Sequence, residues 1–192
     1  MMRSYSFVLV MLCVAGSFTS AQVLSHVNFS AGAGFSVPQY QAGDALDTGW
    51  NVNFRGGVNV SPQLAADLDF TYNRSNLNAA TLARLGEPNG DASIWSLAFN
   101  PVIKLAPSRN SVQPYITAGY GLYHRNVTLT QPAVVPALVC DPFFGFCITT
   151  PVGVNQVVAS NSTLKTGFNA GLGFNFRLGD RRAKIFTEAR YH

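Results

Sequence analysis

Charged residues are scarce in this sequence of 192 residues. Asp, Glu, Lys and Arg together make up 11% of it, whereas soluble domains carry about 25%. The 13 Lys and Arg residues outnumber the 9 Asp and Glu residues and give a net charge of +4, but they are scattered and form no basic run. The shortage argues against the charged exterior of a soluble domain, and the scatter gives no reason to expect nucleic acid as a partner.

Long apolar runs are missing as well. After residue 21 the sequence has no stretch of the roughly 18 uninterrupted apolar residues that a membrane helix needs. A mature chain that lies in a membrane must therefore be a closed β-barrel, the other structure that satisfies every backbone hydrogen-bonding group in lipid.

The one earlier apolar run, from Phe7 to Ala15, is too short to cross a bilayer as a helix. Arg3 precedes it and the small residues Thr19–Ala21 follow it. This order of basic, apolar and small residues is typical of a secretory signal peptide. The sequence thus predicts a signal peptide over residues 1–21 and one exported domain over residues 22–192.

Cysteine is rare, and Cys13 lies within the predicted signal peptide. Cys140 and Cys147 remain after export to an oxidising compartment. Pro142 and Gly145 between them favour a chain reversal that brings the two cysteines together. We therefore predict a disulfide between Cys140 and Cys147.

The predicted disulfide encloses three phenylalanines, Phe143, Phe144 and Phe146. A closed loop would present them as a fixed apolar tip. Exposed apolar groups of this kind mark contact sites, so these three residues are the candidates for contact with a surface ligand.

Apolar and polar residues alternate with a period of two in much of the sequence. Between Thr166 and Leu178 every second residue is apolar, and the residues between are Gly and Asn with one Arg. A period of two indicates a β-strand whose faces meet different surroundings. The pattern recurs and predicts seven strands. Their approximate ranges are 27–37, 48–60, 64–72, 94–105, 113–125, 163–178 and 183–192.

The connections between these ranges alternate in length, and the longest covers residues 126–162. Outer-membrane barrels show this rhythm, with short periplasmic turns and long external loops. We expect an all-β fold, an antiparallel up-and-down transmembrane β-barrel with seven strands present out of an expected eight.

Alternation alone does not tell which face is outside. A soluble barrel such as a lipocalin places its apolar set inside and needs a charged exterior, whereas the polar face here is mainly Asn, Gly, Ser and Thr. In a membrane barrel these residues fill a narrow lumen, and Trp50, Trp95, Tyr72 and Tyr120 lie toward strand ends, where an aromatic girdle belongs. The membrane barrel is therefore preferred, with the soluble barrel as the alternative.

Charged residues of the strands fall mostly on the polar face, so we expect them to pair in the lumen. They are Arg55, Asp67, Asp69, Lys104, Arg177, Glu188 and Arg190. A three-residue turn at Ser61–Gln63 sets Val60 opposite Leu64, which places Arg55 opposite Asp69.

Two segments carry a family resemblance, VQPYITAGYGLYHR at Val112–Arg125 and the ending AKIFTEARYH. With the signal peptide and the rhythm of connections, the chain resembles the small outer-membrane barrels of the OmpA-like and opacity-type group over nearly all of its mature length. The resemblance implies an eight-stranded barrel in a Gram-negative-type outer membrane, with the membrane lipid and the barrel assembly machinery as partners. Members serve as anchors, adhesins or narrow channels.

The glycine motifs Gly119-x-Gly121 and Gly171-x-Gly173 are not interpreted as phosphate loops, because neither opens a helix. In strands, such glycines make room for bulky neighbours. We expect them to serve lumen packing.

No catalytic set emerges from the sequence. His124 lacks a nearby serine nucleophile and is interpreted as an interfacial residue. Asp67 and Asp69 are spaced for acid/base work, but the inward arginines favour structural pairing. We predict no enzyme activity, no cofactor and no metal site.

The leading functional hypothesis is an outer-membrane barrel with an envelope-structural or surface-recognition role in its external loops. The alternative is a narrow channel for small solutes. We also expect the domain to be incomplete at its C-terminal end, because bacterial single-chain barrels have an even number of strands. The first and last predicted strands should then lie one strand apart.

Overall fold

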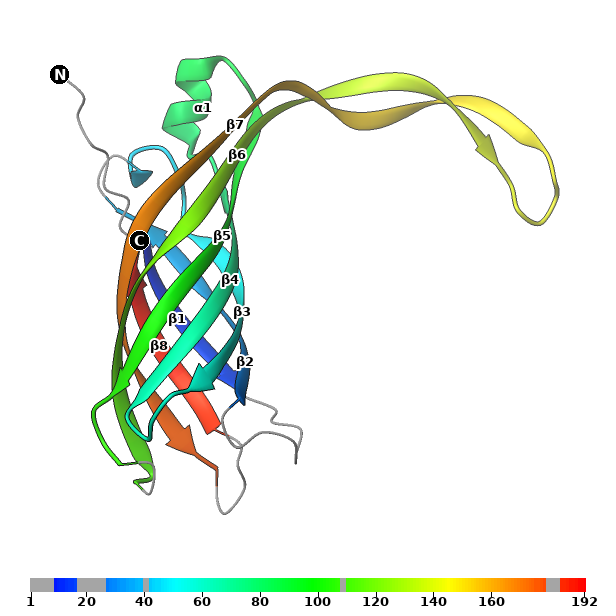
Figure 1. Ribbon diagram of the computed structural model, residues 1–192. Coiled ribbons are helices and arrows are strands. Elements are labelled where there is room, and N and C mark those ends of the chain that lie inside the picture. Colours follow the sequence, from blue (N-terminus) through cyan, green and yellow to red (C-terminus); the bar gives the residue numbers. More distant parts are fainter. Residues whose placement is uncertain (1–8, 17–26, 40–41, 108–109, 179–183) are drawn as a thin grey trace.

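The computed structural model describes residues 9–16, 27–39, 42–107, 110–178 and 184–192. Within this described part, eight antiparallel strands form one closed barrel, in which each strand pairs with its neighbours in sequence and β1 pairs with β8 (Figure 1). The strands are β1 (Leu9–Gly16), β2 (Val27–Pro38), β3 (Gly49–Asn59), β4 (Leu64–Asn76), β5 (Asn89–Lys104), β6 (Val112–Cys140), β7 (Cys147–Arg177) and β8 (Lys184–Tyr191). The predicted antiparallel up-and-down β-barrel is confirmed.

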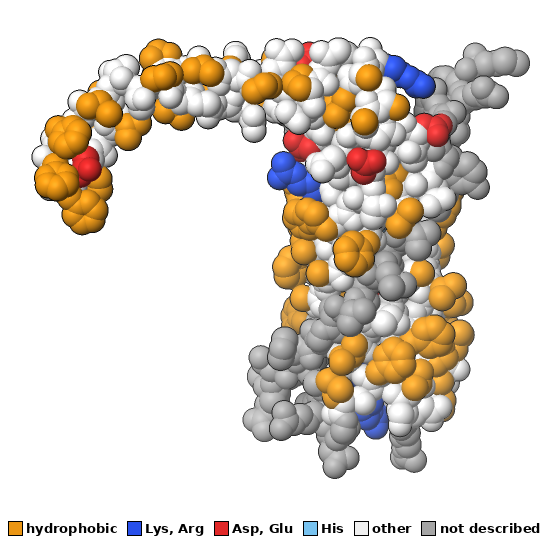
Figure 2. Space-filling view, turned by 180° about the vertical axis from the view of Figure 1, so that it is seen from behind, with side chains coloured by type: hydrophobic (Ala, Val, Ile, Leu, Met, Phe, Trp, Pro, Cys, Tyr) orange, Lys and Arg blue, Asp and Glu red, His pale blue; other side chains and the backbone are white. Residues whose placement is uncertain are grey.

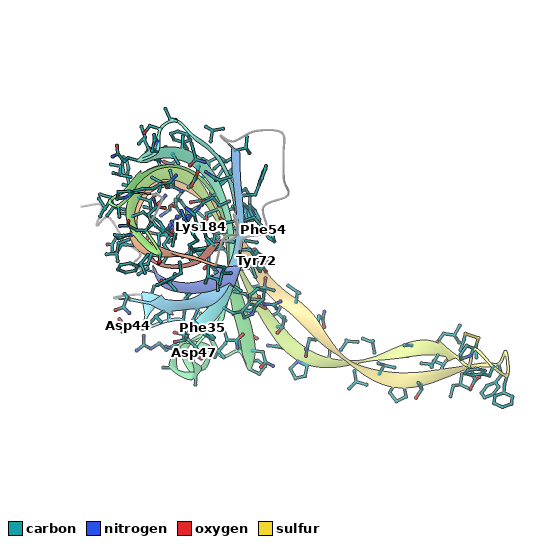
Figure 3. All side chains as sticks on the ribbon, turned by 90° about the horizontal axis from the view of Figure 1, so that it is seen from below. Phe35, Asp44, Asp47, Phe54, Tyr72 and Lys184 are labelled. Carbon is teal, nitrogen blue, oxygen red and sulfur yellow. A yellow bond between two sulfur atoms is a disulfide. The ribbon has the colours of Figure 1, made fainter. Side chains whose placement is uncertain are left out.

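The barrel wall has its apolar face outside. Along β4, Asp69 is buried while Leu68 and Phe70 on either side of it are exposed. In the view along the barrel, Lys184 lies inside the ring of strands and Phe54 lies outside it (Figure 3). Figure 2 shows hydrophobic side chains over the wall and charged ones toward its ends. A soluble barrel would need the opposite arrangement, so that alternative is wrong.

Strand β1 lies in the segment for which the sequence predicts a signal peptide. It pairs with β2 over five residue pairs and with β8 over four. β2 and β8, the first and last of the seven predicted strands, are therefore one strand apart. No strand is predicted from the sequence here, because an apolar run suits a signal peptide as well as a strand in the wall of a membrane barrel.

The connection predicted as a loop over residues 126–162 is instead a continuation of β6 and β7. The two strands pair from Val112↔Phe176 to Cys140↔Cys147 and project far beyond the barrel (Figure 1). The loop prediction is wrong, because both faces of a two-stranded hairpin meet the same surroundings and no period-two signal is required of it.

The connection between β4 and β5 carries one short helix, α1 (Ala79–Leu85). Asn78 caps it by accepting a hydrogen bond from the Thr81 N–H at 2.8 Å, and its amide donates to the Asp44 carbonyl at 2.7 Å. These bonds tie two neighbouring connections together at one end of the barrel. Among the described residues, none of the helices has the length and apolar character to cross a membrane.

Candidate functional site

Four charged side chains form a closed ring in the lumen, which we call the charge ring. Arg55 of β3 donates to Asp69 of β4 (Nε to Oδ1, 2.6 Å) and to Glu188 of β8 (Nη2 to Oε2, 2.8 Å). Arg190 of β8 lies 2.7 Å from each of the same two carboxylates. Each arginine thus bridges both carboxylates, and the ring carries no net charge.

The four side chains of the charge ring are buried, so their charges are balanced by one another and not by water. None of its four side chains is more than 11% exposed. The Tyr115 hydroxyl donates to Glu188 at 2.6 Å, and the Asn100 amide donates to Asp69 at 2.6 Å. Breaking such a buried pair leaves an uncompensated charge, which costs about 3–5 kcal/mol. The ring therefore holds β3, β4, β5, β6 and β8 together from within.

The register of β3 and β4 places the ring's first pair. Arg55 lies opposite Asp69 in the ladder, the position that the length of the Ser61–Gln63 turn predicts. Asp67, two residues along the same face, lies farther off, with its Oδ2 3.8 Å from Arg55 Nε.

Besides Asp67, two more of the predicted lumen charges lie outside the ring. Lys104 donates to Asn59 at 2.5 Å, near the end of β5. Arg177 is exposed at the end of β7 and lies opposite Lys184 in the ladder. Both follow the inward parity, but the strands end there, and within the described part of the chain neither forms an ion pair with a carboxylate. Their pairing in the lumen stays a prediction.

Polar layers occupy the lumen on either side of the charge ring. On one side the Ser36 hydroxyl donates to Asn73 at 2.9 Å, and the Asn51 amide donates to the Ser36 hydroxyl at 3.3 Å. On the other, Lys184 donates to Gln113 at 3.2 Å. Hydrogen-bonded side chains thus occupy the interior on both sides of the charge ring.

Strand glycines make room for these side chains. A Cβ on Gly173 would stand 2.5 Å from Tyr115 Cζ and 2.6 Å from the Thr187 carbonyl oxygen, and one on Gly119 would overlap the Asn100 side chain. These glycines therefore admit the two residues that hydrogen-bond to the charge ring.

Aromatic residues line the outside of the wall across adjacent strands. Trp50 packs on Tyr72 with ring centroids 5.7 Å apart, and Trp95 stacks on His124 at 5.3 Å. Such a row is expected of the aromatic girdle of a membrane barrel. His124 is engaged in that row, and the described residues hold no cluster of His, Cys, Asp or Glu suited to a metal ion.

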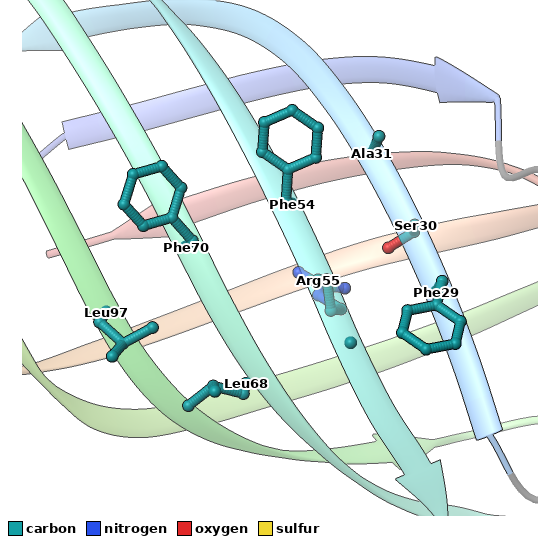
Figure 4. A pocket seen from close by; sticks show the side chains of 9 residues that line it. Phe29, Ser30, Ala31, Phe54, Arg55, Leu68, Phe70 and Leu97 are labelled. Atoms are coloured by element: carbon teal, nitrogen blue, oxygen red, sulfur yellow. The ribbon is translucent and has the colours of Figure 1, made fainter.

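A shallow groove of about 380 Å³ also lies on the outer wall, over β2 to β5. Phe29, Phe54, Phe70 and Leu97 line it, while Arg55 points away from them into the barrel (Figure 4). Because its lining belongs to the apolar face of the strands, we assign the groove to the lipid-facing wall.

The most prominent external feature is the arm, defined here as residues 131–156. β6 loses its partner β5 after Asn89↔Thr130, and the register between β6 and β7 shifts between Leu129 and Thr130. Such a bulge bends a strand and increases its twist. Beyond it the arm turns away from the barrel (Figure 1).

Prolines protect the edges of the arm. Asp141 N–H donates to the Phe146 carbonyl, and hydrogen-bonded and non-hydrogen-bonded pairs alternate along an antiparallel ladder. Counting back from that pair, Pro136↔Pro151 falls in the non-hydrogen-bonded class, so both proline nitrogens face the free edges. Missing donors discourage pairing with a further strand.

The end of the arm, which we call the tip, comprises Cys140–Cys147. The two cysteines form a disulfide with their Cα atoms 4.0 Å apart, seen as the yellow bond in Figure 3. Phe143 and Phe144 are 90% and 79% exposed, and Phe146 is exposed as well. The three predicted contact residues therefore stand together at the far end of the molecule.

Hydrogen bonds within the tip order its backbone. The Asp141 carboxylate accepts from the N–H groups of Phe143 (2.8 Å) and Phe144 (2.9 Å). Gly145, at φ 69°, donates its N–H to the Asp141 carbonyl. Glycine adopts this left-handed backbone conformation readily because it has no Cβ.

Sequence reasoning missed Tyr115, Asn100 and Asp141 as members of these sites. The alternation along the strands places Tyr115 and Asn100 inward. It does not tell which inward residues of other strands reach the charge ring. Asp141 precedes a proline, a common way to begin a turn, and that signal was available.

The closed barrel, its apolar wall, its row of aromatic residues and its filled polar interior define a transmembrane β-barrel of the outer-membrane type. The family model described as outer membrane protein beta-barrel domain matches residues 7–192. The chain belongs to this family, which places the protein in the outer membrane among its lipids.

The chain was also compared with curated proteins and with solved structures. No curated protein matches the chain. The crystal structure of Ail, the attachment invasion locus protein of Yersinia pestis, in complex with the heparin analogue sucrose octasulfate, matches with 13% sequence identity and a TM-score of 0.37 over 98% of each chain.

Proposed function

We propose that this protein is a non-enzymatic outer-membrane barrel that recognises a surface through its arm, with the barrel as anchor. The observation that carries this proposal is the contrast between the two parts of the structure. The lumen is filled and internally paired, whereas the arm extends outward and exposes three phenylalanines at a disulfide-closed tip.

The filled lumen favours this role over the channel alternative. Conduction would require the charge ring to open, and each of its arginines contacts two carboxylates. Residues 1–21 are proposed to direct export to the envelope before barrel assembly.

Deletion of the arm tests the recognition role. In the variant, residues 131–156 are replaced by a two-residue Asn-Gly turn, which is suited to a hairpin. Bacteria that display this variant should attach to cultured animal cells much less than bacteria with the intact protein, at equal amounts of folded barrel. Equal attachment by the two strains would refute the role of the arm.

Single-channel recording in planar bilayers tests the anchor role of the barrel. The intact protein should show no reproducible open conductance, and neither should the arm deletion, because the charge ring is unchanged. A steady conductance that increases in a variant lacking Arg55 would favour the channel instead.

A further inference from the structure

The chemistry of the tip narrows the kind of surface that it fits. Between residues 126 and 162 the sequence has one charged residue, Asp141, and neither lysine nor arginine. Its carboxylate is engaged by two backbone N–H groups within the tip. The tip is therefore an apolar surface without a cationic group.

We propose that the tip inserts its phenylalanines into the interface of a second membrane, one made of zwitterionic phospholipid. This inference rests on the proposed role of the arm in surface recognition and names the chemistry of its partner. The barrel anchors the protein in its own membrane, and the tip binds the other.

The turn within the tip, at residues 141–145, meets one physical requirement for entering lipid. A backbone group that leaves water must keep a hydrogen bond. The N–H groups of Asp141, Phe143, Phe144 and Gly145 all donate within the tip. All backbone donors of residues 141–145 are therefore satisfied when the turn enters an apolar phase, because Pro142 has no N–H group.

Charge selects the kind of membrane. An anionic surface, whether lipopolysaccharide or a sulfated polysaccharide, attracts basic groups, and the tip offers an acidic one. A neutral phospholipid interface does not require basic groups, and exposed aromatic side chains can insert into it. The outer leaflet around the barrel, which is rich in lipopolysaccharide, is therefore the wrong partner.

Insertion is limited to the tip. The arm has two strands, so both of its edges carry unpaired backbone groups, and the prolines at Pro136 and Pro151 remove only two of the donors. Unpaired edges are not tolerated in hydrocarbon. The arm should stay in water while its tip reaches about 30 Å beyond the end of β5 along the strands.

The experiment uses full-length folded protein in nanodiscs of ordinary phosphatidylcholine, mixed with vesicles of brominated phosphatidylcholine. Bromine quenches an indole that enters the vesicle membrane. Phe144→Trp places the reporter at the tip, and Val134→Trp places a matched one at an arm position that is 72% exposed. Wild-type protein gives the background of Trp50 and Trp95, which remain in the nanodisc.

We expect vesicles to quench the reporter at position 144 and to leave the reporter at 134 unquenched. Quenching at both positions would mean that the arm lies flat on lipid, and quenching at neither would mean that the tip does not insert. Either result overturns the proposal. So would quenching that appears only when phosphatidylglycerol is added, because binding would then follow negative charge.

A pair of serine variants measures the contribution of the phenylalanines. Phe143→Ser should weaken partitioning of the protein to phosphatidylcholine vesicles at least about ten-fold, since burying a phenylalanine side chain is worth roughly 1.5–3 kcal/mol. Val134→Ser should leave it unchanged. Equal weakening by the two variants, or no change in either, would overturn the proposal.

The lipid proposal and the recognition role can fail separately. If vesicles do not bind but arm deletion still abolishes attachment to cells, the arm recognises a protein or glycan and only the lipid proposal fails. If arm deletion has no effect on attachment, the recognition role fails as well.

Discussion

Among single residues, Asp69 is notable because it is buried and contacts three polar side chains from other strands. It accepts from Arg55 at 2.6 Å and from Asn100 at 2.6 Å and lies 2.7 Å from Arg190. Its oxygens therefore join β4 to three other strands, and the two arginines would repel each other without it. Its removal should have consequences throughout the barrel.

We predict that Asp69→Asn lowers the free energy of unfolding by on the order of 3 kcal/mol, because it leaves two buried arginines with one shared carboxylate between them. Reversible urea unfolding in lipid vesicles measures the change. Asp91→Asn is the matched control, since Asp91 pairs with Arg74 at 3.5 Å at a more exposed position and should cost at most about 1 kcal/mol. Equal losses in the two variants would contradict the charge ring as a stabilising unit.

Gly173→Ala should also destabilise the barrel, because the added methyl would collide with both the Tyr115 ring and the Thr187 backbone. Overpacking of this kind costs about 1–3 kcal/mol. The fraction of protein that resists unfolding at a fixed urea concentration reports it. Gly153→Ala is the control, since nothing lies within 4 Å of that added methyl, and it should unfold like the wild type.

Among the elements, β6 and β7 differ from the other strands because they belong to two environments. The first part of β6 and the last part of β7 lie in the barrel wall, where alternation is strict. The last part of β6 and the first part of β7 form the arm, held by mutual pairing and by the disulfide at the tip. The bulge at Leu129/Thr130 separates the barrel wall from the arm. We therefore expect a mutation in one part to leave the stability of the other unchanged.

Replacement of both cysteines, Cys140→Ser with Cys147→Ser, tests this independence. The tip should lose the constraint of its closed loop, worth about 2–3 kcal/mol locally, so its amide hydrogens should exchange faster. The barrel should keep its resistance to unfolding. A drop in barrel stability equal to that of Asp69→Asn would show that the arm and the wall are coupled.

For the molecule as a whole, the continuous ladder from β2 to β8 predicts resistance to detergent. A barrel keeps its backbone hydrogen bonds internal, so the protein should be recovered in the outer-membrane fraction and migrate faster in SDS when it is not boiled. The arm deletion should keep both properties. Recovery in the soluble periplasmic fraction would contradict the membrane barrel.

Closure of the barrel raises a question about its N-terminal strand, since β1 lies inside the segment with signal-peptide character. We expect N-terminal sequencing of the outer-membrane form to begin at Gln22. The edges of β2 and β8 would then need another strand, because each unpaired backbone group in hydrocarbon costs on the order of several kcal/mol. A mature form that retains Leu9–Gly16 would instead make β1 the closing strand.

The amino-acid sequence alone specifies seven of the eight strands in the barrel wall. Alternation is a local property, and it predicts each strand from β2 to β8 and the outward direction of their apolar residues. The length of the Ser61–Gln63 turn even sets the pairing of Arg55 with Asp69, because register passes directly through a short turn. The disulfide pairing likewise follows from a short loop.

Only the tertiary structure decides which residues meet across the lumen and what the long connection becomes. Glu188 and Arg190 reach Arg55 and Asp69 because the barrel closes, and closure joins strands that are far apart in sequence. Arg177 misses the ring although its parity is correct, because it lies at the end of β7. The arm takes its form from pairing between two chain segments, a non-local interaction that leaves no periodic signal in either of them.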